Sequence, residues 1–468
     1  MVQAKFPILD WQHLISNKRL GQELHHAERH DERSEFKRDY DRLIFSAPFR
    51  RLQNKTQVFP LPGSIFVHNR LTHSLEVASV GMSLGSDVAR DVIRRNPALA
   101  GSLVEELGTI VSSACLAHDL GNPPFGHSGE KAIQTFFSEG AGSVLRDKLP
   151  DDVWSDLIHF EGNANAFRIL THRFSGRREG GFAMTYSTLA SIVKYPYPST
   201  AIPYVGKEKF GFFTSEAPTY HKIASELGIT ASSQFTEHSS QLKPHTSNLK
   251  PQTYPRHPLV YLVEAADDIC YEVMDIEDAH KLKLLSYEET RDLLLAFFDD
   301  DVQRAIMQRI ETEHITDENE QVVYMRASVI GKLENECVEA FLHNEAAIMA
   351  GTFRGALIKH IGERQRKAYE QCTKVALSKI YHSKPVLDIE LGGYHIMGTI
   401  LERMVDAIIS PDRFYSQQLL RRVSSQYEIN APDMPTRVMA VIDFISGMTD
   451  VFALDFYQKI NGTSLPII

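Results

Sequence analysis

The chain has 468 residues, 43% of them apolar, and carries a net charge of −10 at pH 7. This length can bury a large core, and by itself it suggests two or three domains. The net negative charge argues against a protein that binds nucleic acid over most of its surface, although it is compatible with a local basic cleft. The four cysteines show no CxxC spacing, which is typical of reduced thiols in a cytoplasmic protein. The N-terminus carries no signal-peptide core, and no apolar run reaches the roughly 18 residues that would span a bilayer.

Residues 1–59 are predicted to form an N-terminal helical segment. Three histidines, His25, His26 and His30, lie close together in its polar first half. We interpret them as part of a solvated helical face and not as a second metal site, because no carboxylate pattern accompanies them. From residue 35 onward, arginines and aspartates alternate with aromatic and aliphatic residues, which favours a helix packed on the core.

A helical pattern that follows a turn at residues 60–64 carries Arg70 and His73 one turn apart. The planar guanidinium of Arg70 presents several donors in a fork that suits phosphate oxygens. The imidazole of His73 is a candidate metal ligand. Helical patterns continue to residue 117, with a break at Asn96 and Pro97.

Residues 110–130 contain several candidate metal-binding and catalytic residues. An apolar run at residues 110–117 predicts a buried helix that ends at His118 and Asp119. An imidazole and a carboxylate are both good ligands for a divalent metal. Adjacent helical residues point about 100° apart, so one ion has to sit across the helix end to touch both. A Gly-Asn-Pro-Pro segment then breaks the helix, and a new helix places His127 and Glu130 on one face.

Residues 259–287 are predicted as one helix with an unusual number of carboxylates. Asp267, Tyr271 and Asp275 recur every four residues and therefore share one face. Burying an unpaired polar group costs several kcal/mol, so such a helix needs partners or a metal for its acids. Asp267 and Asp268 are rival ligands, and the alignment with Tyr271 favours Asp267, because Asp268 points roughly 100° away.

Two regions carry weaker signals. Residues 196–258 form a loop-rich insertion, and a run of this length without structure indicates either a functional lid or mobility. Lys194, at the end of the preceding apolar helix, either extends to water or reaches a phosphate. Residues 281–468 are almost wholly helical in pattern, and we expect them to complete the core and make subunit contacts.

Histidine, His-Asp and Asp, in that order on three separate helices, is the pattern of HD-domain metallohydrolases, which this chain resembles. Longer motifs are similar to those of deoxyguanosine triphosphate triphosphohydrolases: residues 38–45, 49–59, 118–130, 161–163, 209–213 and 264–271, with a weaker echo at 443–450. One departure is Asn165, where family members often carry Gln, and this puts a peripheral contact in question. The resemblance implies an all-α fold, with an HD helical core at residues 60–280 elaborated by additional helices.

The resemblance also implies a metal centre with an acid–base pair beside it. The implied ligands of a divalent ion, Mn or Mg first and Fe, Co, Ni or Zn as alternatives, are His73, His118, Asp119 and Asp267. His127 and Glu130 are the implied catalytic pair, in which the carboxylate orients the imidazole. That pair either activates a water molecule or protonates the leaving 5′-oxygen, and the sequence leaves both open.

Five residues are implied to bind the substrate: Gln53, Arg70, Lys194, Tyr271 and Asp275. Arg70 and Lys194 would neutralise a triphosphate, and Tyr271 would pack where a 2′-hydroxyl would clash. Gln53 would hold the sugar 3′-hydroxyl, because an amide can donate and accept; without the resemblance it is interpreted as a surface amide. Tyr394 and His395, after a break expected at residues 392–393, are outside candidates for a wall of the nucleotide site.

By resemblance, the expected reaction is hydrolysis of a deoxynucleoside triphosphate, dGTP foremost, to the deoxynucleoside and inorganic tripolyphosphate. The expected partners are this nucleotide, further copies of the chain in a homo-oligomer (a hexamer in the family) and single-stranded DNA, in the cytoplasm and without a membrane. Two alternatives stay open: another HD phosphohydrolase, such as a nucleotidase or phosphodiesterase, and a nucleotide-sensing or single-strand-binding protein with a vestigial site. Base preference and allosteric activation are not determined by the sequence.

Overall fold

The computed structural model describes residues 8–23, 32–59, 67–231 and 251–464. The three histidines at positions 25, 26 and 30, and residues 232–250 of the expected insertion, lie outside this part of the chain. Across the described ranges the chain forms helices, turns and three isolated β-bridges, without a strand, so the all-α prediction is confirmed. No helix within these ranges is both long and apolar enough to cross a bilayer.

The first half of the chain contains α1 (Trp11–Leu14), α2 (Glu35–Ile44), α3 (Ala47–Arg51), α4 (Arg70–Arg95), α5 (Leu107–Ala117), α6 (Gly126–Ser138), α7 (Asp151–Ile158), α8 (Gly162–Thr171), α9 (Tyr186–Ile192), α10 (Ile202–Val205) and α11 (Ala217–Glu226). The second half contains α12 (Leu259–Lys281), α13 (Tyr287–Leu295), α14 (Asp300–Thr312), α15 (Glu318–Met349), α16 (Glu363–Val375), α17 (Lys384–Ile409), α18 (Phe414–Leu420), α19 (Met434–Ser446) and α20 (Asp450–Ile460). Short 3₁₀ segments include η1 (Leu52–Asn54), η4 (Ala141–Lys148) and η6 (Thr214–Glu216), and η8 (Ala376–Ile380) is a π-helical turn.

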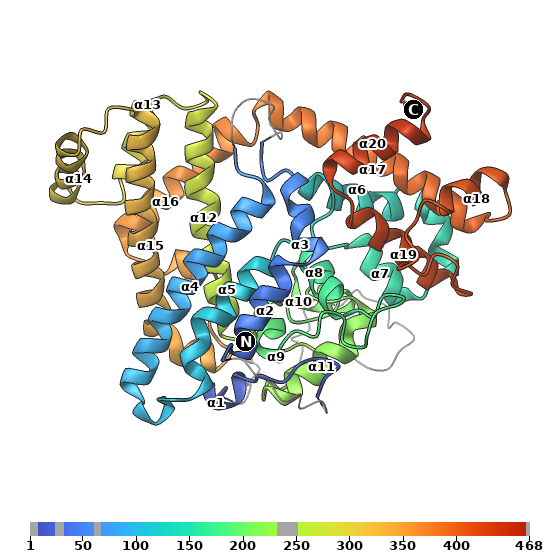
Figure 1. The fold of residues 1–468 in the computed structure, drawn as a ribbon, viewed down its shortest axis with the longest axis horizontal. Helices are drawn as coiled ribbons and strands as arrows, with labels where there is room; N and C mark the ends of the chain where they lie inside the picture. The colour runs from blue at the N-terminus through green and yellow to red at the C-terminus, as the bar shows by residue number, and fades with distance from the viewer. Residues whose placement is uncertain (1–7, 24–31, 60–66, 232–250, 465–468) are drawn as a thin grey trace.

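The helices bury two hydrophobic clusters. The first cluster joins α4, α5, α12 and α15, which stand together in Figure 1 with α13 and α14 outside them. The second cluster joins α6 and α7 to α17, α19 and α20, on the other side of the molecule in the same view. The connection between α5 and α6 therefore crosses from one cluster to the other, and this connection follows the His-Asp pair.

Local sequence explains how the central helices begin and end. A capping box starts α4: the Asn69 side chain accepts from the Thr72 amide at 3.0 Å, and the Thr72 hydroxyl accepts from the Asn69 amide at 3.1 Å. The helix runs unbroken to Arg95 and stops before Pro97, as predicted. All but one residue of α5 is buried, and this helix ends at His118 as predicted.

Three expectations about helix boundaries need correction. The helix predicted for residues 259–287 ends at Lys281, and a Ser286-capped helix, α13, begins at Tyr287. The insertion at residues 196–258 contains α10 and α11 within its described part. No break occurs at residues 392–393, because α17 continues through them; a Cβ on Gly393 would lie 2.5 Å from Cγ of Phe125, so close packing explains this glycine.

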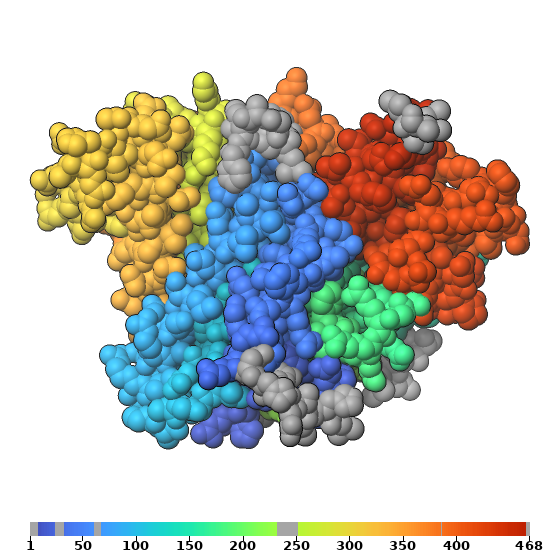
Figure 2. Space-filling model, in the orientation of Figure 1, coloured from blue at the N-terminus to red at the C-terminus, as the bar shows by residue number. Residues whose placement is uncertain are grey.

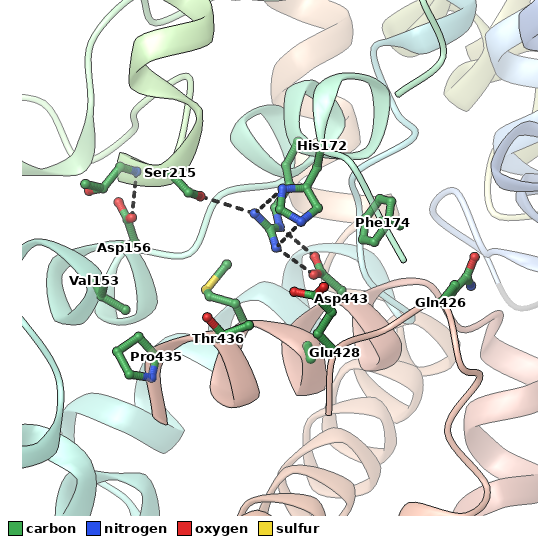
Figure 3. A pocket seen from close by; sticks show the side chains of 14 residues that line it. Val153, Asp156, His172, Phe174, Ser215, Gln426, Glu428, Pro435, Thr436 and Asp443 are labelled. Carbon is green, nitrogen blue, oxygen red and sulfur yellow. Dashed lines mark hydrogen bonds and ion pairs between the residues drawn. The ribbon is translucent and has the colours of Figure 1, made fainter. Parts of the chain in front are cut away.

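A buried ionic network ties α8 to α19. Arg168 donates from Nε and Nη2 to the two carboxylate oxygens of Asp443, each at 2.8 Å, and from Nη1 to Glu216 at 2.7 Å. Figure 3 shows the part of this network that includes Asp443 and His172 at the edge of a cavity of about 280 Å³. Arg168 and Asp443 are already paired with each other, and no candidate site residue lines this cavity. We therefore treat the network as a tie between the two clusters and not as the reaction site.

Candidate metal centre and active site

Helices α4 and α5 bring three of the predicted ligands together. The ligand atoms of His73, His118 and Asp119 lie within 4.8 Å of one another, so this group can hold a metal ion. Asp267 on α12 faces the same point, with Oδ1 at 3.1 Å from Nε2 of His73 and 3.5 Å from Nε2 of His118. All four predicted ligands therefore converge from three helices.

The surroundings of His118 fit a metal ligand. Its Nδ1 lies 2.6 Å from the carbonyl oxygen of Cys115, an arrangement in which the neutral ring donates from Nδ1 and leaves Nε2 unprotonated. In the described part of the chain Nε2 is buried without a hydrogen-bond partner, and carboxylate oxygens of Asp119 and Asp267 lie 3.5 Å away. When the ring is neutral, Nε2 carries a buried lone pair without a partner, which is costly, and coordination to a divalent cation would satisfy it.

The two adjacent aspartates of α12 are in different environments. Although burial opposes it, the charges of His118 and His73 hold the pKa of Asp267 well below its usual range. Burial, followed by the charge of Asp267, raises the pKa of Asp268 to about 8, and Oδ2 of Asp268 is buried without a partner in the described residues. Asp267 thus faces the imidazoles as a carboxylate, while Asp268 points elsewhere.

Metal binding should depend on pH in a defined direction. Although burial lowers it, the charges of Asp119 and Asp267 raise the pKa of His118 to about 9, so the metal-free site holds a proton at neutral pH. A ligating imidazole must release that proton, and the apparent affinity should therefore rise with pH up to about 9, by up to about tenfold per pH unit. Calorimetric titration with Mn²⁺ at pH 6, 7 and 8 measures this, and an affinity that does not change with pH would contradict it.

The predicted acid–base pair is present on the first turn of α6. Nδ1 of His127 lies 3.2 Å from Oε2 of Glu130, and the other oxygen of Glu130 accepts from the Gly162 amide at 2.7 Å. The Glu130 hydrogen bond raises the pKa of His127. The His127 side chain is 81% exposed whereas Glu130 is 10% exposed, so a buried carboxylate orients an imidazole that is open to a substrate.

Arg70 connects the metal centre to α6. It is buried, and Nη1 donates to Oδ2 of Asp119 at 2.6 Å. A Cβ on Gly126 would lie 2.5 Å from Nη2 of Arg70, so the guanidinium packs directly against the start of α6. Arg70 is therefore less free than the sequence suggested: it holds a metal ligand, and contact with phosphate is a prediction for the remaining donors.

Tyr271 and Asp275 continue the face of α12 that starts at Asp267. The rings of Tyr271 and His73 are 6.4 Å apart at 80°, which places the tyrosine next to the metal centre. Asp275 is buried one turn further along, and the hydroxyl of Tyr381 donates to its Oδ2 at 2.7 Å. Tyr381 also lies against Tyr271, with ring centroids 6.1 Å apart. Tyr271, Asp275 and Tyr381 therefore form one wall beside the candidate metal ligands.

Other predicted residues are not drawn into this group. Gln53 is exposed on η1. Nζ of Lys194 is 3.0 Å from Oε1 of Glu264; although burial opposes it, that charge raises the pKa of the lysine. Asn165 donates to the carbonyl oxygen of Gly121 at 2.8 Å, so it holds the loop after the His-Asp pair.

Comparison with known proteins identifies the family. A model described as "HD domain" matches residues 70–177, and one described as "Phosphohydrolase-associated domain" matches residues 360–459. A "Deoxyguanosinetriphosphate triphosphohydrolase-like protein" of Pseudomonas aeruginosa is 38% identical over 467 residues, covering 98% of this chain and 100% of the relative. A protein of the same name from Synechocystis is 35% identical over 472 residues, with coverage of 98% and 100%. The chain belongs to this family.

A more distant relative supports the same assignment. The "Deoxyguanosinetriphosphate triphosphohydrolase" of Yersinia enterocolitica is 28% identical over 500 residues, covering 91% of this chain and 93% of the relative. With an HD domain that contains the three residues able to hold a metal ion, the protein is an HD-domain phosphohydrolase.

Two residues near the candidate site were not selected from the sequence. Tyr381, in the phosphohydrolase-associated domain, completes the α12 wall, and only its distance from Asp275 in space identifies it. Lys209, within the motif at residues 209–213, is half-exposed with Nζ 3.6 Å from Oε1 of Glu161. Its charge acts on His127, and a cation before the Phe-rich run was the available signal.

The outside candidates Tyr394 and His395 lie on α17. The Tyr394 hydroxyl bonds to the Thr135 hydroxyl at 2.7 Å on the exposed side of α6, and the His395 ring packs on Tyr457 with centroids 5.8 Å apart. Both contacts are between helices of the second cluster. The structure therefore shows packing contacts for both residues around α6 and α20, and their part in a nucleotide site stays a prediction.

Proposed function

We propose that the protein hydrolyses a deoxynucleoside triphosphate, dGTP in the first instance, to the deoxynucleoside and inorganic tripolyphosphate. The observation that carries this proposal is the continuous face of α12, which presents Asp267 to the metal-binding histidines and Tyr271 with Asp275 immediately beside them. A phosphate held at the metal centre would thus place the attached sugar against the tyrosine wall.

Three groups of residues have separate roles in the proposed reaction. His73, His118, Asp119 and Asp267 would hold a divalent ion, which supplies Lewis-acid stabilisation of phosphate oxygens and a lowered pKa for a bound water. His127, oriented by Glu130, would transfer the proton, either taking it from the attacking water or giving it to the 5′-oxygen as the bond from Pα to that oxygen breaks. Arg70 and Lys209 would offset the charge of the triphosphate.

Product analysis with dGTP and GTP tests the proposal. With Mn²⁺ or Mg²⁺, dGTP should give deoxyguanosine and tripolyphosphate, whereas GTP should be a very poor substrate. An extra 2′-oxygen would meet the Tyr271 and Tyr381 rings and find little to bond, so the ribonucleotide would pay for a clash and an unpaired hydroxyl. Release of phosphate or pyrophosphate instead would favour a nucleotidase or phosphodiesterase, and binding without any cleavage would favour a sensor.

The tyrosine wall can be tested separately. Tyr271→Ala should narrow the ratio of kcat/KM for dGTP over GTP, chiefly by slowing dGTP and admitting some GTP. Gln53→Ala should weaken both substrates alike, because both carry the 3′-hydroxyl. If Tyr271→Ala leaves the ratio of kcat/KM for dGTP over GTP unchanged, the proposed reaction still stands. Discrimination against the 2′-hydroxyl would then be assigned to Tyr381.

We also propose that an arginine surface contacts single-stranded DNA. Two hollows lie where α3, the 173–182 loop and the C-terminal region meet. Arg177 and Arg178 line one of them, Arg51 and Arg422 line the other, and Arg50 and Arg421 are the chain neighbours of Arg51 and Arg422. Figure 2 shows N-terminal, central and C-terminal segments meeting on one face. None of these six forms an ion pair with a carboxylate in the ranges described, although the net charge of the chain is −10.

Exposed aromatic rings accompany these charges. Phe45 is 69% and Phe452 40% exposed, and Cζ of Arg50 is 5.8 Å from the Phe45 ring centroid. Burial and the charge of Arg177 lower the pKa of Arg51, as expected where like charges gather without an acid. Unpaired cations together with stacking platforms are the pattern of single-strand binding.

Fluorescence anisotropy with a labelled oligo-dT tests the arginine surface. Binding should weaken with salt, with a slope of about −0.7 per phosphate contacted. Arg51→Glu combined with Arg177→Glu should abolish it, whereas Arg304→Glu, at an exposed ion pair with Asp301 on α14, should not. Equal losses in both variants, or no binding at low salt, would contradict the proposal.

The oligomeric and cellular predictions have less support. Self-association is testable by light scattering of the purified chain. The four cysteines are all free and buried, in agreement with a reducing compartment such as the cytoplasm, and fractionation of the native cell would test that location.

A further inference from the structure

The two halves of the candidate site stand on different hydrophobic clusters. The metal-binding residues project from α4, α5 and α12, which belong to the first cluster, while His127 and Glu130 project from α6, which packs in the second. The loop at residues 121–125 connects them. The position of His127 and Glu130 relative to the metal-binding residues therefore depends on the contacts that hold this loop.

Asp450, the first residue of α20, contacts this loop and the N-terminal segment together. Its Oδ1 accepts from the Phe125 amide at 2.9 Å. Its Oδ2 accepts from the amide and the hydroxyl of Thr56, at 2.7 and 2.5 Å. The adjacent Lys55 makes a parallel link, donating from Nζ to the carbonyl oxygens of Asn122 at 2.5 Å and Ser446 at 3.0 Å. Asp450 is itself buried, so these bonds are shielded from water.

The residue that Asp450 holds is in an unfavourable backbone conformation. Phe125 has φ of 61°, a left-handed conformation that is strained for a residue other than glycine and persists only where surroundings enforce it. Its ring packs on the backbone of α17 at Gly393, and the Ser128 hydroxyl donates to the carbonyl oxygen of Glu390 at 2.6 Å. The first turn of α6 is thus held by α17 and α20, both within the phosphohydrolase-associated domain.

We propose that Asp450 is a positioning residue: by holding Phe125 in this conformation against Thr56, it sets His127 and Glu130 relative to the metal centre. This inference rests on the proposed hydrolysis for its readout. If this is right, the phosphohydrolase-associated domain contributes to the reaction, because its hydrogen bonds hold the first turn of α6, which carries His127 and Glu130. Asp450 touches neither metal ligands nor substrate and acts through Phe125.

Asp450→Asn is the decisive variant. It preserves the shape of the side chain, but an amide cannot accept from both Phe125 and Thr56, so one side meets a donor. We expect kcat to fall by about tenfold to a hundredfold, the scale for small misplacement of catalytic groups, with KM and metal content little changed. Asp455→Asn on the same helix, where the carboxylate pairs only with Lys459 at the surface, should match the wild type.

Thr56 provides a second pair of variants in case Asp450→Asn does not fold. Thr56→Val removes one donor to Asp450 and should lower kcat in the same direction, and Thr56→Ser, which keeps the hydroxyl, should recover most of the loss. A wild-type kcat in folded Asp450→Asn, a loss explained by missing metal, or equal rates in Thr56→Val and Thr56→Ser would overturn the proposal. If the wild type does not cleave dGTP, the proposed function fails, and the same comparison with bis(p-nitrophenyl) phosphate still decides the role of Asp450.

Discussion

Replacing Asp267 by alanine should remove the bound metal and abolish turnover, whereas Asp268→Ala should keep both. The carboxylate of Asp267 faces the imidazoles of His73 and His118 at 3.1 and 3.5 Å. Without it, the site keeps two imidazoles and Asp119, whose Oδ2 is already engaged by Arg70. Three ligands of which one is shared with an arginine should bind a divalent ion far more weakly.

The neighbouring aspartate is a matched control. Asp268→Ala removes a carboxylate of the same size, one residue away, whose Oδ2 is buried without a hydrogen-bond partner among the described residues. Because burial raises its pKa to about 8, the loss of this group should cost little and can increase stability. Metal analysis of both purified variants decides the assignment: loss of the ion in Asp268→Ala with retention in Asp267→Ala would reverse it.

Local patterns predicted several residues that the structure brings together at the candidate metal centre, although the full ligand set came from the family resemblance. The apolar run before His118 marks a buried helix and the prolines after it mark its end, so the His-Asp pair lies where that helix ends. The four-residue spacing of Asp267, Tyr271 and Asp275 fixes their common face, which the structure retains in α12. Each of these inferences needs only the geometry of a single helix.

The residues that sequence reasoning missed depend on contacts across the fold. Tyr381 meets Asp275 across 106 positions, and Asp450 meets Phe125 across 325. No periodicity connects such pairs, because the contact is made by packing of one helix on another. The break expected at Gly393 failed for the same reason: the glycine makes room for the Phe125 ring, which only the assembled structure places beside it.

Replacing His127 by alanine should reduce kcat by about 10²–10⁴-fold, the usual scale for losing a general acid or base. Metal content and folding should be unaffected, because the side chain is 81% exposed and is not part of the metal-binding group. His13→Ala is a matched control: its Nδ1 also pairs with a carboxylate three residues away, at 2.9 Å, on the exposed α1. Loss of metal in His127→Ala would instead make His127 a ligand.

The pH dependence of kcat in Glu130→Gln tests whether Glu130 acts on the proton transfer by His127 or only lies beside it. The Glu130 hydrogen bond raises the pKa of His127, and glutamine keeps the shape and an oxygen for the Gly162 amide but removes the charge. The pKa of His127 should then fall toward its ordinary value. If His127 is the general acid, the loss of rate as pH rises should begin at lower pH than in the wild type. If it is the general base, the gain of rate as pH rises should begin at lower pH. In either case the limb of the pH–rate profile that is assigned to His127 shifts to lower pH. A limb that stays in place would show that another group carries the proton.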